Sequence, residues 1–165
     1  MKKLIAFTGL AGSGKTTAAL WLIKEHSYKA RSFATPIKKM IALIWPQCTE
    51  KNTAYPELGG KTLRQAYQLL GTEWGRVLMW DDLWVRQLVD SLSEHDYYVV
   101  DDLRFTNEAK GLKDAGAYIV EIRRPGTQKM DHASEQGIDP LYVDEVIIND
   151  GTPEDFIRKL KDVCS

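Results

Sequence analysis

The sequence predicts an α/β fold in which a parallel sheet of about five strands is covered by helices on both faces. Two observations lead to this fold class. Short apolar segments alternate along the chain with longer segments whose apolar residues recur at helical spacing. In addition, a chain of 165 residues with 44% hydrophobic residues can bury one good core but has little length for a second. We therefore expect a single three-layer domain that spans residues 1–165.

Five apolar segments are short enough to be strands, and they occur at residues 4–7, 28–33, 97–100, 117–122 and 145–148. The second segment is the weakest of the five. Residues 97–100 are nearly all apolar, which is typical of a central strand that is covered on both faces.

Helices are expected from Thr17 onward and at residues 36–45, 62–70, 82–92 and 153–163. Pro36 and Pro153 suit the first turn of a helix, and Thr152 can cap the last helix. Gly71 is expected to end the helix that precedes it. Residues 46–60 carry proline and glycine and are predicted to form a long loop.

The segment GLAGSGKT, from Gly9 to Thr16, matches the phosphate-binding pattern G-x-x-x-x-G-K-[ST] at every fixed position. Its glycines let the backbone wrap around an anion, and the positive end of the following helix faces the same point. A simple turn between a strand and a helix would explain the glycines but not the lysine and hydroxyl that follow. We expect Lys15 to reach the β- and γ-phosphates and Thr16 to bind Mg²⁺. The nucleotide-binding candidates are Ala11, Gly12, Ser13, Gly14, Lys15, Thr16 and Thr17.

The segment YYVVDDLRFTNEA places Asp101 and Asp102 at the end of a buried strand, where a P-loop protein holds its metal. Both aspartates are therefore metal-binding candidates, although a DD pair could also simply end a strand and begin a turn. Arg104 and Glu108 lie four residues apart. They could form an ion pair at the edge of a helix, or Glu108 could hold the guanidinium toward a phosphate.

The segment TLRQAYQLLGTEWGR, with Trp84 shortly after it, has the residue types that bind a nucleoside monophosphate. Arg64 suits the phosphate, Gln68 a base edge and Trp84 stacking, with Gly71 and Thr72 at the end of the helix. The alternatives are a solvated Arg64, an exposed Gln68 and a Trp84 that packs in the core. We expect the acceptor-binding region to span about residues 36–92.

A mobile lid is expected at about residues 123–140, within which RRPGTQKMDHASEQG is polar and lies between two apolar strands. Its two arginines could close over the triphosphate, Arg123 on the nucleotide and Arg124 on the transferring phosphoryl group. The alternative is an ordinary exposed loop.

Charge and cysteine content restrict the partners. Lys and Arg number 22 against 23 Asp and Glu, so there is no general electrostatic field for nucleic acid or for a membrane surface. Cys48 and Cys164 indicate neither a disulfide framework nor a zinc site, and no apolar run approaches membrane-spanning length. We expect a cytoplasmic protein whose partners are small-molecule nucleotides.

The motifs favour a kinase over a hydrolase. The sequence has no N-K-x-D motif, with which guanine-specific switches recognise the base. Hydrolytic motors tend to have a water-activating glutamate directly after the strand-end aspartate, whereas here Asp102 follows Asp101. A small kinase must hold a second substrate opposite the P-loop and exclude water with a lid, and the sequence offers segments for both tasks. The alternatives are a P-loop switch or assembly ATPase, and a kinase of a metabolite that is not a nucleotide.

The chain resembles the deoxynucleoside monophosphate kinases of tailed bacteriophages. The resemblance rests on GLAGSGKTT, FATPIKK, RQAYQLLGTEWGR, LWV, VVDDLRFTNEA, RRPG followed by HASE, and VIINDG. It implies a three-layer P-loop kinase fold with an acceptor region and a lid, in a monomer or homodimer located in the host cytoplasm. It also implies transfer of the γ-phosphoryl group of ATP, with Mg²⁺, to deoxynucleoside monophosphates for viral DNA synthesis.

The same resemblance implies roles for individual residues. Lys38, within FATPIKK, joins Arg64, Gln68, Gly71, Thr72 and Trp84 as a substrate-binding candidate. The D-x-R-x-x-x-E set falls on Asp102, Arg104 and Glu108, which join Lys15 and Arg124 as catalytic candidates.

Overall fold

The computed structural model describes residues 2–127 and 137–164. Within these residues, one sheet has five strands in the order β2-β5-β1-β6-β7, and all of its neighbours are parallel. The strands are β1 (Leu4–Thr8), β2 (Lys29–Arg31), β5 (Tyr98–Val100), β6 (Tyr118–Arg123) and β7 (Glu145–Ile148). The predicted parallel five-stranded sheet is therefore confirmed.

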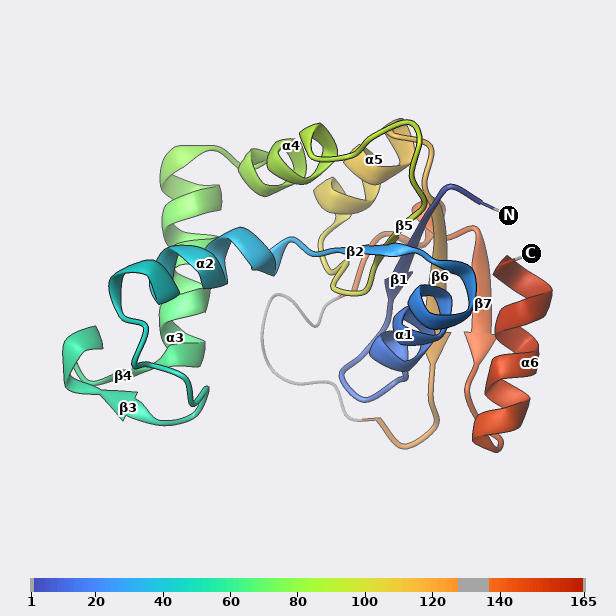
Figure 1. The fold of residues 1–165 in the computed structure, drawn as a ribbon, viewed down its shortest axis with the longest axis horizontal. Helices are drawn as coiled ribbons and strands as arrows, with labels where there is room; N and C mark the ends of the chain where they lie inside the picture. The colour runs from blue at the N-terminus through green and yellow to red at the C-terminus, as the bar shows by residue number, and fades with distance from the viewer. Residues whose placement is uncertain (1, 128–136, 165) are drawn as a thin grey trace.

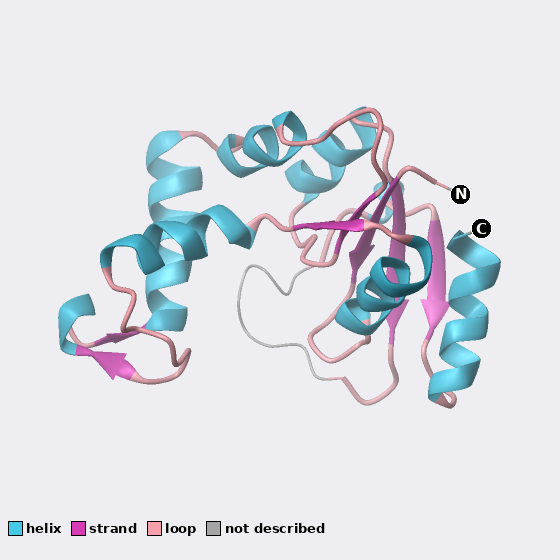
Figure 2. Cartoon of the chain, viewed as in Figure 1, coloured by secondary structure: helices cyan, strands magenta, loops and turns pink. Residues whose placement is uncertain are grey.

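Helices cover both faces of this sheet (Figure 2). On one face, Ile5 and Phe7 of β1 pack with residues of α1 (Lys15–His26) and α6 (Pro153–Cys164). On the other face, Leu4 and Ala6 pack with residues of α4 (Leu83–Asp90) and α5 (Thr106–Asp114). All five residues of β1 are buried, as expected for a strand with helices on both sides.

Helix α5 was not among the elements expected from the sequence. Its nine residues include few apolar ones, and Ala109 and Leu112 are the ones that lie buried in the core. An apolar stripe this narrow gives a weak helical pattern. The helix start is instead stabilised by Glu108, whose carboxylate accepts a hydrogen bond from the Phe105 backbone N–H at 3.0 Å.

The region predicted to bind the acceptor, residues 36–92, is called the acceptor side, and much of it extends away from the sheet (Figure 1). Its main elements are α2 (Ala34–Ile44), the short antiparallel strands β3 (Ala54–Tyr55) and β4 (Lys61–Thr62), and α3 (Leu63–Gln68). The stretch predicted as a long loop thus contains β3 and a 3-10 turn, η1 (Pro56–Leu58). Thr62 caps α3 by accepting a hydrogen bond from the Gln65 backbone N–H at 3.2 Å.

The expectation that Gly71 ends this helix is wrong. The helix continues as η2 (Leu69–Met79), a π-helix in which, for example, the Trp80 N–H donates to the Gly75 carbonyl five residues earlier. Gly71 and Gly75 are buried because neighbours approach them closely. A Cβ atom at Gly71 would lie 2.9 Å from Ile37, and one at Gly75 would lie 2.6 Å from the Trp84 indole nitrogen.

Replacing Gly75 with alanine should therefore destabilise the protein. Alanine favours a helix over glycine by up to about 1 kcal/mol. Overpacking against the rigid indole of Trp84 costs roughly 1–3 kcal/mol and should outweigh that gain. We expect Gly75→Ala to lower the midpoint of thermal unfolding measured by circular dichroism.

Glu73→Ala provides the matched control, because Glu73 is an exposed residue of the same helix. Its free energy of unfolding should stay within about 0.5 kcal/mol of the unsubstituted protein. A Gly75→Ala protein as stable as this control would show that the Trp84 contact is not tight.

Candidate active site

The P-loop connects the carboxyl end of β1 to the start of α1. Gly9, Gly12 and Gly14 all have positive φ angles, as the predicted wrapping of the loop requires. Lys15, which is buried, donates from its ammonium Nζ to the carbonyl oxygens of Gly9 at 2.6 Å and Leu10 at 2.8 Å. These bonds hold the ammonium group within the turn of the loop.

Asn149 is a residue of this loop environment that the sequence analysis missed. It follows β7, and its side-chain amide donates to the Ser13 carbonyl at 2.8 Å. The Asn149 backbone N–H donates to the Arg123 carbonyl at 2.7 Å. The sequence could have indicated this residue, because Asn149 directly follows the apolar run of the last strand, within the VIINDG segment.

The structure separates the two candidate metal-binding aspartates. The Thr16 hydroxyl donates to Asp101 Oδ2 at 2.9 Å, so the P-loop hydroxyl and a strand-end carboxylate lie together. This donor pair fits Mg²⁺, which P-loop proteins bind with a hydroxyl, a strand-end aspartate and nucleotide phosphates. Among the described residues, no group of three or more His, Cys, Asp or Glu side chains forms a separate metal site.

Asp102 has a different environment. It is partly buried, and its carboxylate accepts hydrogen bonds from the Ser32 hydroxyl at 2.7 Å and from the backbone N–H groups of Phe33 at 3.1 Å and Ala34 at 3.0 Å. Burial raises the pKa of Asp102, and the three hydrogen bonds partly offset this effect. These contacts hold the start of α2 to the end of β5.

Glu108 holds the guanidinium of Arg76, whereas the sequence had suggested that of Arg104. Arg104 contributes its backbone N–H, which donates to Glu108 Oε2 at 2.9 Å. Burial raises the pKa of Glu108 to about 7, while the Arg76 charge and the backbone hydrogen bonds act in the opposite direction. Arg76 is the last residue of the RQAYQLLGTEWGR segment, but nothing in the local pattern pairs it with Glu108.

Gln68 and Thr72 lie together on the acceptor side. They line a cavity of about 330 Å³ with Lys61, Gln65, Leu69 and Glu73. Arg64 is exposed, and its Nε donates to Asn52 Oδ1 at 3.3 Å. Lys38 is an exposed residue of α2.

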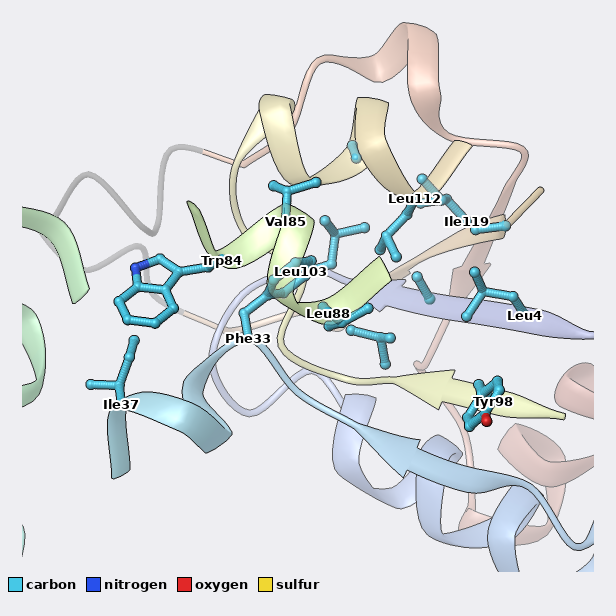
Figure 3. Close-up of a cluster of buried hydrophobic side chains, with 14 residues drawn as sticks. Leu4, Phe33, Ile37, Trp84, Val85, Leu88, Tyr98, Leu103, Leu112 and Ile119 are labelled. Carbon is cyan, nitrogen blue, oxygen red and sulfur yellow. The ribbon is translucent and has the colours of Figure 1, made fainter. Parts of the chain in front are cut away.

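Trp84 lies in the core, which corrects the expected stacking role and favours the packing alternative. Its side chain points from α4 toward Ile37 (Figure 3), and the residue is 4% exposed. Its indole N–H donates to the Gly71 carbonyl at 2.7 Å. Because its ring is buried and its N–H is bonded to the Gly71 carbonyl, Trp84 packs against η2.

Much of the predicted lid, residues 128–136, lies outside the described residues. Of its two arginines, Arg123 donates to Glu121 Oε2 at 2.7 Å, and Arg124 is exposed. Beyond the gap, the Asp139 backbone N–H donates to the Thr106 hydroxyl at 3.0 Å, which joins this part of the chain to α5.

No helix among residues 2–127 and 137–164 has the length and apolar character needed to cross a membrane.

Comparison with known proteins identifies the family of the chain. The family model for deoxynucleotide monophosphate kinase matches residues 60–160. A protein of Acanthamoeba polyphaga mimivirus, to which this activity is ascribed, is 32% identical over 182 aligned positions, which cover 95% of this chain and 93% of the relative. The deoxynucleotide monophosphate kinase of Enterobacteria phage T4 is 33% identical over 107 residues, which cover 61% of this chain and 44% of the phage protein.

A solved structure supports the fold. Shikimate kinase from Aquifex aeolicus matches 98% of this chain and 95% of its own with a TM-score of 0.59, at 15% sequence identity. The family-model match extends from just before β4 into α6 and includes Gln68, Thr72, Asp101 and Glu108. Together with the mimivirus relative, which matches over nearly its whole length, it confirms the resemblance drawn from the sequence. The chain belongs to the deoxynucleotide monophosphate kinase family.

Proposed function

We propose that this protein transfers the γ-phosphoryl group of ATP to deoxynucleoside 5′-monophosphates and that Mg²⁺ is bound through Thr16 and Asp101. The observation that carries the proposal is the 2.9 Å contact between these two side chains beside the P-loop lysine. It joins the P-loop to the carboxylate that we propose binds the metal, at one edge of the sheet. The family of the chain supplies the class of acceptor.

The proposed chemistry depends on position and charge. An oxygen of the acceptor phosphate attacks the γ-phosphorus of ATP, and ADP leaves with the bridging oxygen. A phosphate monoester has its second pKa near 6, so the acceptor is largely a dianion at neutral pH and needs no general base. Lys15 would place the β- and γ-phosphates and balance their charge, and the bound metal ion would neutralise charge that develops on them.

The proposed acceptor site uses the α3–η2 side of the molecule. A cavity of about 330 Å³ has the size of a small ligand pocket, and the Gln68 amide can both donate to and accept from a base edge. Thr72, Lys38 and Arg64 remain proposed acceptor-binding residues. Arg104, Arg123 and Arg124 are proposed to contact phosphate groups during transfer.

The reaction itself can be tested by incubating the protein with ATP and Mg²⁺, with and without each deoxynucleoside monophosphate. ADP and the deoxynucleoside diphosphate should form in equal amounts, and only when an acceptor is present. ADP formation at the same rate without any acceptor would indicate an ATPase and would overturn the proposal.

Lys15→Met should abolish most phosphoryl transfer. One fixed charge of this kind is worth roughly 10²–10³ in rate. Turnover should be measured with saturating acceptor, beside a thermal melt that reports folding.

Lys24→Met is the matched control, because Lys24 lies in the same helix with its side chain 84% exposed. It should retain normal turnover. Near-normal turnover in a folded Lys15→Met protein would remove the P-loop lysine from the mechanism.

The two aspartates should respond differently to substitution. Asp101→Ala should raise the Mg²⁺ concentration needed for half-maximal turnover and leave the melting temperature almost unchanged. Asp102→Ala should destabilise the fold by roughly 1–3 kcal/mol, because it leaves the partly buried donors of Ser32, Phe33 and Ala34 without their acceptor.

A Mg²⁺ titration of turnover and a thermal melt for both variants make this comparison. If Asp102→Ala shifts the Mg²⁺ requirement and Asp101→Ala does not, the assignment of the metal-binding carboxylate is reversed.

A further inference from the structure

The α3–η2 helix is connected to the sheet by a buried ion pair. The Arg76 guanidinium contacts the Glu108 carboxylate, and the side chains are 9% and 2% exposed. Removing two charges from water is unfavourable unless their geometry and remaining hydrogen bonds compensate. An ion pair buried this deeply therefore fixes its two elements in one relative position.

The other contacts of Arg76 reach further segments of the chain. Its guanidinium lies over the Phe105 ring, 4.2 Å from the ring centroid. Its Nη1 also lies 3.4 Å from the Asn107 side-chain oxygen and 3.4 Å from the Asp81 carbonyl. One side chain of η2 thus contacts both the turn after β5 and the segment before α4.

Glu108 transmits this contact to the edge of the sheet. One carboxylate oxygen, Oε1, binds Arg76, and the other, Oε2, accepts the backbone N–H groups of Arg104 at 2.9 Å and Phe105 at 3.0 Å. The same carboxylate therefore holds the acceptor-side helix and the backbone of Arg104. The turn begins directly after Asp101 and Asp102.

Arg76 also follows the proposed acceptor residues along one helix. Gln68, Thr72 and Arg76 are spaced four residues apart, which is close to one helical turn, so they lie toward the same side of the α3–η2 helix. Because the helix is a continuous unit, anchoring Arg76 sets the place of Gln68 and Thr72 relative to the turn that carries Arg104.

We propose that Arg76 is a positioning residue for the acceptor: through Glu108 it fixes the acceptor-binding helix against the strand-end turn. This inference rests on the proposed function and deepens it. Glu108 then acts through Arg76 and through the backbone of the turn, and not as a group that exchanges a proton with the substrate.

The test compares Arg76→Gln, Arg76→Lys and Glu108→Gln in the full chain. For each variant, the Michaelis constants for a deoxynucleoside monophosphate and for ATP are measured with kcat and the melting temperature. Arg76→Gln should lower kcat/KM for the acceptor by roughly ten- to hundredfold, mainly through KM, and leave the KM for ATP within about twofold. Arg76→Lys keeps the charge but loses the planar guanidinium group, so its effect on kcat/KM for the acceptor should be intermediate.

Two further measurements separate positioning from simple loss of stability. Guanidinium at low millimolar concentration should partly restore the acceptor KM of an Arg76→Ala protein. The double variant Arg76→Gln/Glu108→Gln should be no worse than the more affected single variant, because the two residues act as a unit. Arg86→Gln, which breaks the exposed Arg86–Asp90 pair on α4, is the matched control and should change neither Michaelis constant.

An unchanged acceptor KM in folded Arg76→Gln would overturn the inference, and so would equal changes in both Michaelis constants. If Arg76→Gln does not fold, the Arg76→Lys and Glu108→Gln proteins decide by the same criterion. Failure of the proposed function is distinguishable, because the unsubstituted protein would then show no turnover that depends on the acceptor.

Discussion

The parallel pairing of β1 with both β5 and β6 is the constraint on which the rest of the structure depends. Parallel strands have their carboxyl ends at one edge of the sheet, where ligands of open α/β folds bind. At this edge Thr16 contacts Asp101 across 85 positions of sequence, and Asn149 contacts Ser13 across 136. The P-loop is thus held from two sides, so that less of it needs to be ordered when a nucleotide binds.

The sheet also explains why two adjacent aspartates have different environments. Neighbouring residues of a strand point to opposite faces. Val99 packs in the cluster that contains α1, and Val100 packs in the cluster that contains α4 and α5. Continuing this alternation places Asp101 on the α1 side, next to Thr16, and Asp102 on the other side, next to Ser32. The same alternation is visible in the sequence, but only the three-dimensional structure shows which face α1 covers.

Features that depend on local patterns were predicted well from the sequence. The five strands and the P-loop are examples, because each is specified by residues close together in the chain. Contacts between distant segments were not accessible in this way. Arg76 and Glu108 lie 32 residues apart, and neither has a local pattern that indicates the other. Gly71 has the signature of a helix end, yet the helix continues through it, and a Cβ atom there would lie 2.9 Å from Cδ1 of Ile37, a residue 34 positions away.

The π-helix η2 makes the acceptor side sensitive to the number of residues in the chain, and not only to their identity. Its hydrogen bonds join residues five apart, whereas those of an α-helix join residues four apart. Loss of one residue between Gly71 and Arg76 would rotate everything after it about the helix axis relative to the first half of the helix. That rotation would turn the guanidinium away from the sheet edge. An insertion or deletion within η2 would therefore change which side chains face the sheet. Residues 46–53 contain no helix or strand, so a change in their length would not alter the helical phase, although it would affect the contact between Asn52 and Arg64.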